Sequence, residues 1–408
     1  MSCEARYPFA PSEDEWWQKE FAVLPDKYDD TKPRKEDIKW ERVVFGLWRK
    51  LFFSSLVSGD FVSRFRYLKL PQQGPGVPLK LLNPVVVALI DDGVDLPHQE
   101  SADHSFISES FHAYDYGRRV WPWWNSAAGH GTLIARLIHR ICPTAAIYVI
   151  KLETRTTEAD NEILIDAKSA IKAIYHAVEE GVDIISMSWK CALKPEVQKE
   201  WEGAIDAAAR KGILMFCSAS DRGQFGERTF PHACRPNITF PVGAALPSGK
   251  VFDLVPDASS LDFALPGYQV FLEDDPVRQA ETSDKLESHT GISVATALAA
   301  GLAALVLEIV RIGLAHNLNK GRTDDSALVA SDLDVVRNRN ILSRIFCERI
   351  GTSKDSGANL NKFIVVDDIF GTCARRLADD GPDNQLDTIA NLAKDLLSGY
   401  RSRPLPIR

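Results

Sequence analysis

The chain has 408 residues, of which 45% are hydrophobic and 25% are charged, and its formal net charge is -8. This composition is typical of a folded globular protein and excludes a disordered chain, and the length suffices for one large domain or two ordinary ones. The negative net charge disfavours non-specific binding to nucleic acid or to an anionic membrane, because both need a basic surface.

The first 79 residues differ in character from the rest of the chain. Tryptophans, among them Trp16 and Trp17, lie between Lys, Glu and Asp residues, which is typical of short amphipathic helices. Residues 71–78 (P-Q-Q-G-P-G-V-P) predict a linker. We therefore expect a helical N-terminal extension over residues 1–79 and a new domain that begins near Lys80.

Three absences suggest where the protein resides. The N-terminus lacks the basic stretch and apolar run of a secretion signal. The most apolar helix candidate, residues 294–310, carries Thr296 and Glu308 and is too short for a convincing membrane span. The seven cysteines are odd in number and contain no C-x-x-C pair, which supports neither a zinc site nor a disulfide framework. We expect an intracellular, cytoplasmic protein with reduced thiols and no membrane partner.

From residue 84 onward, strand and helix patterns alternate. Strands are predicted over residues 84–90, 146–152, 182–188 and 213–218, and helices over residues 130–141, 163–180 and 196–210. The first run (P-V-V-V-A-L-I) is apolar and β-branched, as in a strand buried on both faces of a parallel sheet. The alternation predicts an α/β fold in three layers, a mostly parallel twisted sheet flanked by helices. Active sites in such sheets lie at the carboxyl ends of the strands.

Three short segments carry residues capable of chemistry at such ends. Asp91 follows the first strand and, taken alone, reads as a capping residue in a turn. His130 lies between two glycines at the start of a helix, where an oriented imidazole can act as a general base. Ser293 begins a helix rich in small residues, where it is either a plain N-cap or a nucleophile whose oxyanion the helix N-terminus stabilises. Together the three predict nucleophilic catalysis.

The order and wording of these segments resemble the subtilisin family of serine peptidases. Residues 91–95 (D-D-G-V-D) resemble the aspartate motif of the family, in the D-D-G form of its kexin-like branch, and residues 129–132 (G-H-G-T) match its histidine motif. Residues 291–301 resemble the serine motif. Residues 182–189 are similar to the substrate-lining strand, and residues 230–244 to the F-P-A…P-N…V-G-A stretch.

The resemblance covers residues 80–312 and extends more loosely to residue 375. We therefore expect a subtilisin-like peptidase domain over residues 80–375. Residues 384–397 have the pattern of an amphipathic helix that packs on the core, so residues 376–408 are expected to form a C-terminal helix and tail.

The resemblance implies a serine endopeptidase that acts on protein or peptide substrates. Ser293 would attack the peptide carbonyl, His130 would accept its proton and return it to the leaving amine, and Asp91 would hold His130 in the right tautomer. This chemistry needs no cofactor, and the chain has no D-x-D-x-D-G loop, so we assign neither a cofactor nor a metal. The oligomeric state stays open.

By the same resemblance, an extended peptide would pair with the strand end that holds Ser186, Ser188, Trp189 and Lys190. Many relatives have Gly where this chain has Lys190. This lysine either narrows the specificity pocket and favours acidic side chains, or is simply a solvated residue at the end of a loop.

Two positions depart from the family pattern at the oxyanion site. Asp221 stands where the family has an Asn that donates to the oxyanion, and an ionised Asp cannot donate. Either Asp221 is protonated beside the developing charge, or the backbone N–H of Ser293 carries the oxyanion; one prohormone-processing branch also has Asp here and is proteolytic. Ile292 replaces the Thr that usually precedes the nucleophile.

These departures leave open a catalytically weak or inactive domain that serves as a peptide-binding or regulatory module. A third reading, the acid-acting sedolisin branch, needs Glu in place of His130, and the complete G-H-G-T motif argues against it.

Overall fold

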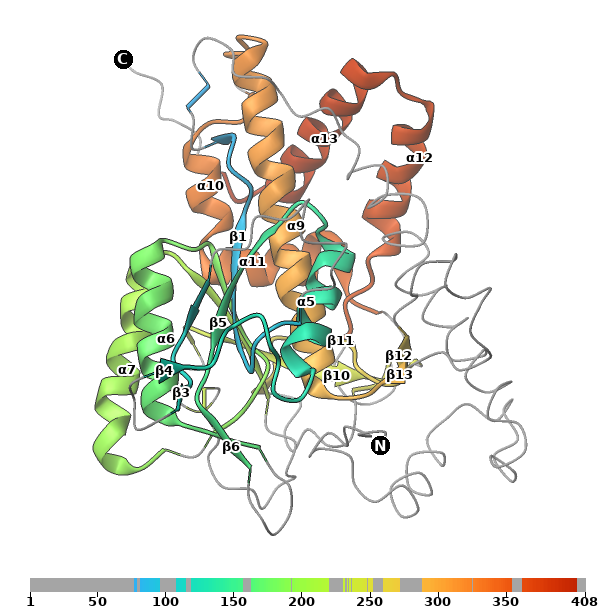
Figure 1. Cartoon of the computed structure of the whole chain (residues 1–408). Coiled ribbons are helices and arrows are strands. Elements are labelled where there is room, and N and C mark those ends of the chain that lie inside the picture. Colours follow the sequence, from blue (N-terminus) through green and yellow to red (C-terminus); the bar gives the residue numbers. More distant parts are fainter. Residues whose placement is uncertain are drawn as a thin grey trace, which may run out of the picture.

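A sheet of seven strands, paired in parallel throughout, lies at the centre of the computed structural model (Figure 1). The strand order is β11 (Phe263–Pro266), β10 (Phe240–Ala245), β9 (Leu214–Ser218), β8 (Ile184–Met187), β1 (Val86–Asp91), β5 (Ala146–Lys151) and β2 (Ser108–Ser110). Antiparallel pairs form at its margins between β3 (Ala113–Tyr114) and β4 (Arg119–Val120), β6 (Thr154–Thr156) and β7 (Ile163–Ile165), and β12 (Val270–Phe271) and β13 (Ser288–His289).

The structure describes residues 77–78, 81–95, 108–114, 119–156, 163–191, 193–219, 230–231, 233, 235, 237–247, 249–251, 260–271, 288–324, 326–353 and 362–401. The expected helical extension, apart from residues 77–78, lies outside this part of the chain. Asp221 also lies outside it.

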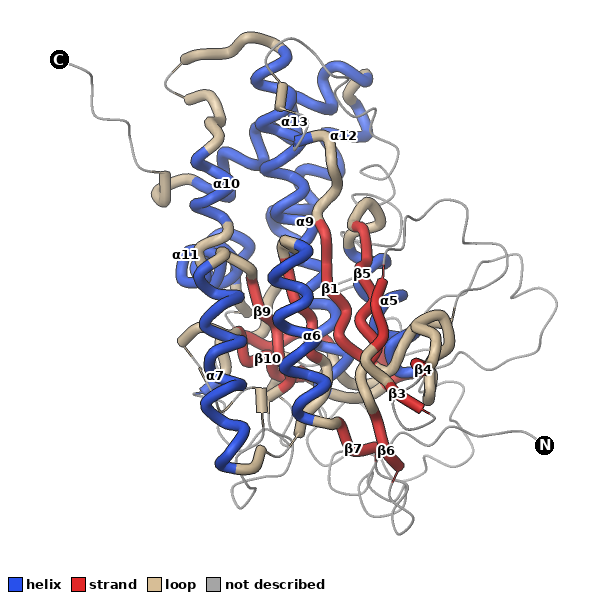
Figure 2. Tube along the Cα trace, turned by 60° about the vertical axis from the view of Figure 1, so that its left-hand side comes forward, coloured by secondary structure: helices blue, strands red, loops and turns tan. Residues whose placement is uncertain are grey.

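The apolar run in β1 supplies both cores of the molecule. Successive side chains of a strand point to opposite faces, so Val87 and Leu89 join one core while Ala88 and Ile90 join the other. Helices α5 (His130–Ile141) and α9 (Ile292–Asn319) cover the first face, and α6 (Ala167–Glu180) and α7 (Pro195–Arg210) cover the second (Figures 1 and 2). The predicted three-layer α/β fold is confirmed.

The predicted helix over residues 163–180 begins too early. Its first residues form β7, which pairs with β6, and α6 begins only at Ala167. Asp166 marks the true start, because its carboxylate caps the helix by accepting from the Ser169 N–H at 2.8 Å. The other strands and helices predicted between residues 84 and 218 are present, with ends that shift by at most two residues.

Helix α9 is longer than the predicted 294–310 and forms the centre of the larger core. By length and composition it is apolar enough to cross a membrane, yet every residue from Val294 to Asn317 is buried inside the protein. Glu308 is fully buried, pairs with Arg311, and accepts from the backbone N–H of Val85 at 2.6 Å. Because each charge compensates the other, both residues are tolerated inside the buried helix. The bond from Val85 to Glu308 ties the helix to the chain that enters β1.

Short helices follow α9 and pack on its end of the molecule (Figure 1). They are α10 (Ser331–Val336), α11 (Arg339–Arg344), the π-helices η7 (Ile345–Gly351) and η8 (Asp367–Gly371), α12 (Thr372–Asp379) and α13 (Pro382–Leu397). Of these, α13 corresponds to the predicted amphipathic C-terminal helix, and its residues Ile389 and Leu396 belong to the core around α9.

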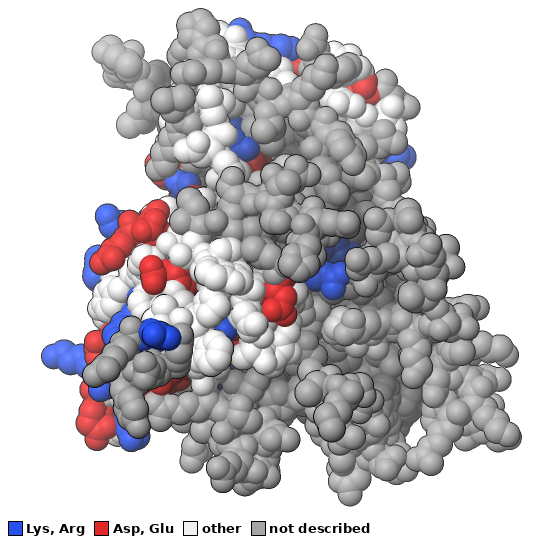
Figure 3. Space-filling view, in the orientation of Figure 1, with Lys and Arg blue, Asp and Glu red and all other residues white. Residues whose placement is uncertain are grey.

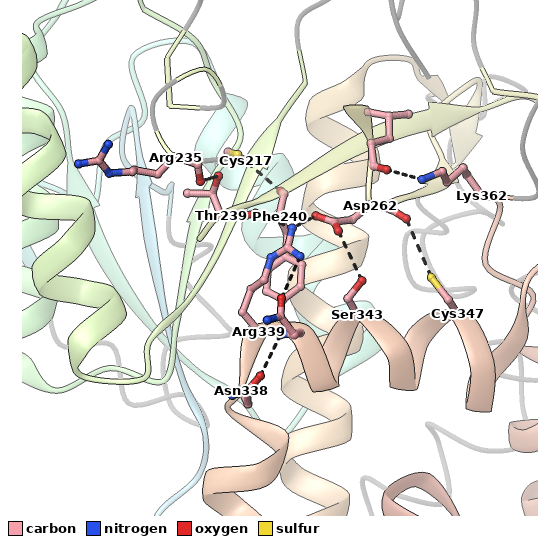
Figure 4. Close-up of polar contacts among 12 residues, drawn as sticks. Cys217, Arg235, Thr239, Phe240, Asp262, Asn338, Arg339, Ser343, Cys347 and Lys362 are labelled. Atoms are coloured by element: carbon pink, nitrogen blue, oxygen red, sulfur yellow. Dashed lines mark hydrogen bonds and ion pairs between the residues drawn. The ribbon is translucent and has the colours of Figure 1, made fainter. Parts of the chain in front are cut away.

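Arg339 fastens α11 to the edge of the sheet (Figure 4). Its guanidinium pairs with Asp262, donates to the carbonyl of Thr239 at 3.1 Å, and has its Cζ 5.0 Å from the centroid of the Phe240 ring. The hydroxyl of Ser343, one turn further along the helix, donates to Asp262 at 3.4 Å. Burial raises the pKa of Asp262, and the charge of Arg339 opposes this rise.

Asp387 of α13 ties that helix to the end of α9. Its carboxylate accepts from His316 (2.9 Å), Lys320 (2.9 Å) and Arg322 (2.8 Å). Partial burial favours the protonated carboxyl, but the hydrogen bonds from His316 and Lys320 and the charge of Arg322 lower the pKa of Asp387 to about 2.

Replacing Asp387 with Asn should lower the free energy of unfolding at neutral pH by up to about 2 kcal/mol. A carboxylate whose pKa is depressed on folding stabilises fully above its ordinary pKa of 3.8 and loses this contribution as the pH falls through about 2. The difference between wild type and variant in urea unfolding, followed by circular dichroism, should therefore shrink over that pH window. A difference that stays constant over this window would contradict the pairing.

Candidate active site

The carboxyl ends of three neighbouring strands, β8, β1 and β5, meet at one edge of the sheet. Asp91 ends β1 and lies in register with Lys151, which ends β5. On the other side of β1, Leu89 pairs with Ser186, so the register continues to Ser188 beside Asp91. The predicted site residues of the first strands therefore collect at this edge, as expected for a parallel α/β sheet.

Asp91 and His130 form a hydrogen bond across this edge. The Nδ1 atom of His130 donates to Oδ1 of Asp91 at 2.8 Å. The carboxylate of Asp91 is buried and the imidazole side chain is 14% exposed, so the pair is largely shielded from solvent. With Nδ1 carrying the proton, Nε2 of the neutral imidazole is the basic nitrogen.

Asp92, which was not singled out from the sequence, organises the backbone around this pair. Its Oδ1 accepts from the Gly131 N–H (2.7 Å) and the Ser126 hydroxyl (2.8 Å), and its Oδ2 accepts from the Ala128 N–H (2.7 Å). One carboxylate thus binds both the first turn of α5 and the segment before it. Burial raises the pKa of Asp92, and the neighbouring charge of Asp91 adds to this rise.

Gly93 and Gly131, one from each motif, are needed because two segments of backbone approach closely there. A Cβ atom on Gly131 would lie 2.1 Å from the carbonyl oxygen of Gly93, and one on Gly93 would lie 2.5 Å from the carbonyl oxygen of Asn125. Gly93 also has a φ of 104°, which side-chain-bearing residues rarely adopt. The close backbone approach that these glycines permit brings His130 against the end of β1.

Lys151 is a second residue that the sequence reading missed. It is buried, and its ammonium group donates to the carbonyl of Asn125. Burial lowers the pKa of Lys151, whereas the charges of Asp92 and Asp95 oppose this effect. The sequence indicates this role through the position of Lys151 at the end of an apolar strand, because a buried lysine needs a nearby counter-charge.

Helices α5 and α9 run in the same direction across one face of the sheet. Helix α5 begins at His130, beside Asp91 at the carboxyl end of β1. The chain that follows the helix re-enters the sheet at the amino end of β5, where the Ala146 N–H donates to the carbonyl of Val85 at 2.9 Å. Helix α9 starts where Gly291 N–H bonds the carbonyl of Gly267, just past the end of β11, and reaches Val85 through Glu308. Both helices therefore run from the carboxyl edge of the sheet to its amino edge.

The packing of α9 against α5 sets the position of Ser293 along the helix axes relative to His130. A Cβ atom on Gly301 of α9 would lie 3.1 Å from the carbonyl oxygen of Ile138 in α5, so the helices touch there. Ser293 precedes Gly301 by the same number of residues as His130 precedes Ile138, about 12 Å along each helix. Ser293, which is partly exposed, therefore lies at the same edge of the sheet as His130.

The end of β9 also reaches the first turn of α9. The hydroxyls of Ser218 and Thr296 are 3.1 Å apart, and Thr296 donates to the carbonyl of Ile292 at 2.9 Å. Ile292 is 5% exposed and packs in the core, which accounts for an apolar residue next to Ser293. Asp221 follows Ser218 by three residues, but it lies outside the described residues.

The four residues expected to line a peptide do not share a surface. Ser186 and Ser188 are buried, and their hydroxyl oxygens have no hydrogen-bond partner in the described part of the chain. Trp189 is 5% exposed, and its indole N–H donates to the carbonyl of Ile90 at 2.6 Å. Its side chain therefore belongs to the core under α6 and α7, and only Lys190 is partly exposed.

The environment of His130 favours its protonated form. Burial lowers the pKa of His130, but the charge and hydrogen bond of Asp91, together with the charge of Asp92, outweigh burial and leave the pKa raised.

No group of three or more His, Cys, Asp or Glu residues that could hold a metal ion is present among the residues the structure describes.

Comparison with known proteins identifies the family to which the fold belongs. The model of the subtilase family matches residues 83–320, more than half of the chain. The chain belongs to the subtilase family. The match includes Asp91, His130 and Ser293, and it ends near the C-terminus of α9.

Curated relatives of this subtilase are serine proteases. The intracellular serine protease of Paenibacillus polymyxa is 26% identical over 250 residues, which cover 58% of this chain and 70% of the relative. The major intracellular serine protease of Bacillus subtilis (strain 168) is 25% identical over 54% of this chain and 68% of its own. The subtilisin-like protease het-Q2 of Podospora anserina is 29% identical over 45% and 50%. Family and relatives support serine peptidase activity.

A solved structure supports the fold of this subtilase. The crystal structure of a lanthipeptide protease has a TM-score of 0.50 and 20% sequence identity, and the match covers 71% of this chain and 87% of that protein. At this level of identity the likeness concerns the fold alone.

The raised pKa of His130 gives a direct test of its pairing with Asp91. In an NMR titration the His130 ring should titrate above its ordinary pKa of 6.5 in the wild type, and at a lower pH in an Asp91→Asn variant, because only the weaker effect of Asp92 then opposes burial. His139, at the far end of α5, serves as the control and should keep its midpoint. Equal His130 midpoints in both proteins would contradict the assignment.

Proposed function

We propose that this subtilase is a serine endopeptidase in which Asp91, His130 and Ser293 act as the catalytic triad. The observation that carries the proposal is the Asp91–His130 hydrogen bond at the edge of the sheet where α9 also begins. The family and the serine proteases among its relatives support the same reaction class.

In this mechanism the neutral imidazole of His130 takes the proton of Ser293 through Nε2 as the hydroxyl attacks the peptide carbonyl. Asp91 keeps the Nδ1 proton in place and stabilises the imidazolium. His130 then gives this proton to the leaving amine as the peptide C–N bond breaks, and water, with His130 again as the base, hydrolyses the resulting acyl-enzyme. The first N–H groups of α9 have no acceptor within the helix, and they point toward the carbonyl oxygen that becomes negative.

Asp221 is the proposed side-chain donor to that oxyanion. Ser218 contacts the first turn of α9, and three further residues of chain extend at most about 11 Å, which is enough for Asp221 to reach Ser293. In a water-excluded site beside a developing negative charge, the carboxyl is expected to be protonated and can donate.

The wider setting follows the sequence expectations. Substrates are proteins or peptides. The two relatives whose names include the word intracellular support an intracellular location, which we propose to be the cytoplasm. On the face shown in Figure 3, basic and acidic side chains are interspersed over α6 and α7, which fits a protein that does not bind nucleic acid. We propose residues 80–375 as the peptidase domain and residues 376–408 as its C-terminal helix and tail.

A fluorophosphonate probe should label the wild type on Ser293 and should not label a Ser293→Ala variant. Turnover of a denatured protein substrate should fall by about a thousandfold or more in the variant, because the nucleophile is lost while binding remains. Peptide mass spectrometry identifies the labelled residue. Ser288, which lies in β13 ahead of the same helix, gives the matched control, and Ser288→Ala should keep both labelling and turnover. Labelling that persists in Ser293→Ala would overturn the assignment.

An Asp221→Asn variant separates the enzyme from an inactive peptide-binding module. If Asp221 donates as a protonated acid, the wild-type kcat should fall as the pH rises and the carboxyl ionises, whereas the Asn variant should not show this fall. At alkaline pH the variant should exceed the wild type by roughly a hundredfold, the size of one such donor in subtilisin itself, from which this figure comes. A wild type that is inactive at every pH, with activity only in the variant, would instead identify a silent module.

A further inference from the structure

Apolar side chains are exposed at the end of β4 and in the segment that joins β4 to α5. Of the five large apolar residues that the described part of the chain exposes, three lie here: Val120 (51%), Trp121 (47%) and Trp124 (56%). Exposed tryptophans are costly and are concentrated at binding surfaces. We refer to Trp121 and Trp124 as the tryptophan platform.

The backbone under the platform is fixed by hydrogen bonds to the sheet and its margins. The N–H of Trp121 donates to the carbonyl of His112 at 2.8 Å, and the carbonyl of Trp121 accepts from the Ser110 hydroxyl at 2.6 Å. The carbonyl of Trp123 accepts from the Val94 N–H at 2.9 Å. The two rings are therefore presented on a backbone that is ordered before any ligand arrives, which reduces the entropy lost on binding.

The same segment continues directly into the proposed catalytic centre. Two residues after Trp124, the Ser126 hydroxyl donates to Asp92 and accepts from the Gly129 N–H, each at 2.8 Å. Asp92 also binds the N–H of Gly131, next to His130. One carboxylate thus holds both the chain two residues after the platform and the turn that carries His130, so the platform adjoins the part of the chain that leads into α5.

We propose that the tryptophan platform is a substrate-docking surface that binds an aromatic or aliphatic side chain of an extended peptide as the peptide enters the catalytic centre. The proposal rests on the proposed function. A peptide is the occupant because the platform is continuous with the residues that would cut it. Two rigid rings give large apolar contact at low entropic cost, which suits recognition of a single large side chain in an otherwise variable substrate.

Fluorescent Ala/Ser peptides in which one Phe is moved along the chain test this idea. The wild type should cleave the best Phe peptide at least about tenfold more efficiently, in kcat/KM, than the peptide without Phe. A Trp121→Ala/Trp124→Ala double variant should lose this preference mainly through KM, since the interaction is present in both bound substrate and transition state. A Trp124→Phe variant, which keeps a ring, should retain most of it.

Binding is measured in parallel on proteins that carry Ser293→Ala, so that the result does not depend on turnover. Fluorescence anisotropy should show tighter binding of the Phe peptide with the platform intact than with both tryptophans replaced. Tyr175 on α6 is the matched control, because it is an exposed aromatic (38%) on the opposite face of the sheet, and Tyr175→Ala should change nothing. Loss of Phe-dependent binding together with normal fluorophosphonate labelling of the double variant supports the proposal.

Three results would overturn it. The first is equal Phe preference in the wild type and the double variant, in both assays. The second is a change of oligomeric state in the double variant on size-exclusion chromatography with light scattering, which would make the platform a contact between copies. The third is a uniform gain of activity on all peptides, which would mean that the chain's own residues normally cover the tryptophans. Failure of Ser293 labelling in the wild type, by contrast, would remove the proposed function and leave the binding assay decisive.

Discussion

The geometry of the site depends on the hydrogen bonds that the buried carboxylate of Asp92 accepts. This carboxylate accepts from Gly131 in the first turn of α5 and from Ser126 and Ala128 before it, so that the chain folds tightly around the end of β1. Such closeness is possible because Gly131 presents no Cβ to the carbonyl of Gly93. The position of His130 is therefore set by backbone contacts as much as by its own bond to Asp91. An imidazole held in this way keeps its orientation without support from a bound ligand.

The electrostatic character of the edge follows from placing two acids side by side in a buried position. Asp91 and Asp92 both favour a protonated His130, and the carboxylate of Asp92 is stabilised by N–H donors and by the nearby charge of Lys151. Lys151 meanwhile holds the carbonyl of Asn125, in the segment that carries the tryptophan platform. Charge balance and loop position are thus maintained by the same side chains. We expect substitutions here to change acid–base behaviour and substrate binding together, rather than one of them alone.

Much of this arrangement was predictable from the sequence, and the failures have physical causes. Apolar β-branched runs predicted the strands, and small residues predicted α9, because these patterns report burial directly. The predicted helix over 163–180 starts too early because the apolar residues 163–165 fit a strand or a helix equally well, and only the cap at Asp166 marks the start. The burial of the Trp189 side chain is not evident from residue type either, since strand alternation and its bond to Ile90 direct the ring into the core. Contacts such as that of Lys151 with Asn125 join segments that no local pattern connects.

The long reach of α9 has a consequence for the order in which the protein becomes functional during synthesis. Its first turn meets Ser218, 78 residues earlier, and its middle is anchored by Glu308 to Val85, 223 residues earlier. Further along, α13 packs on the same helix through Asp387 and His316. Contacts over such separations form only after the intervening chain has left the ribosome. Ser293 is thus delivered late, so a partly synthesised chain contains the Asp91–His130 pair but lacks the proposed nucleophile.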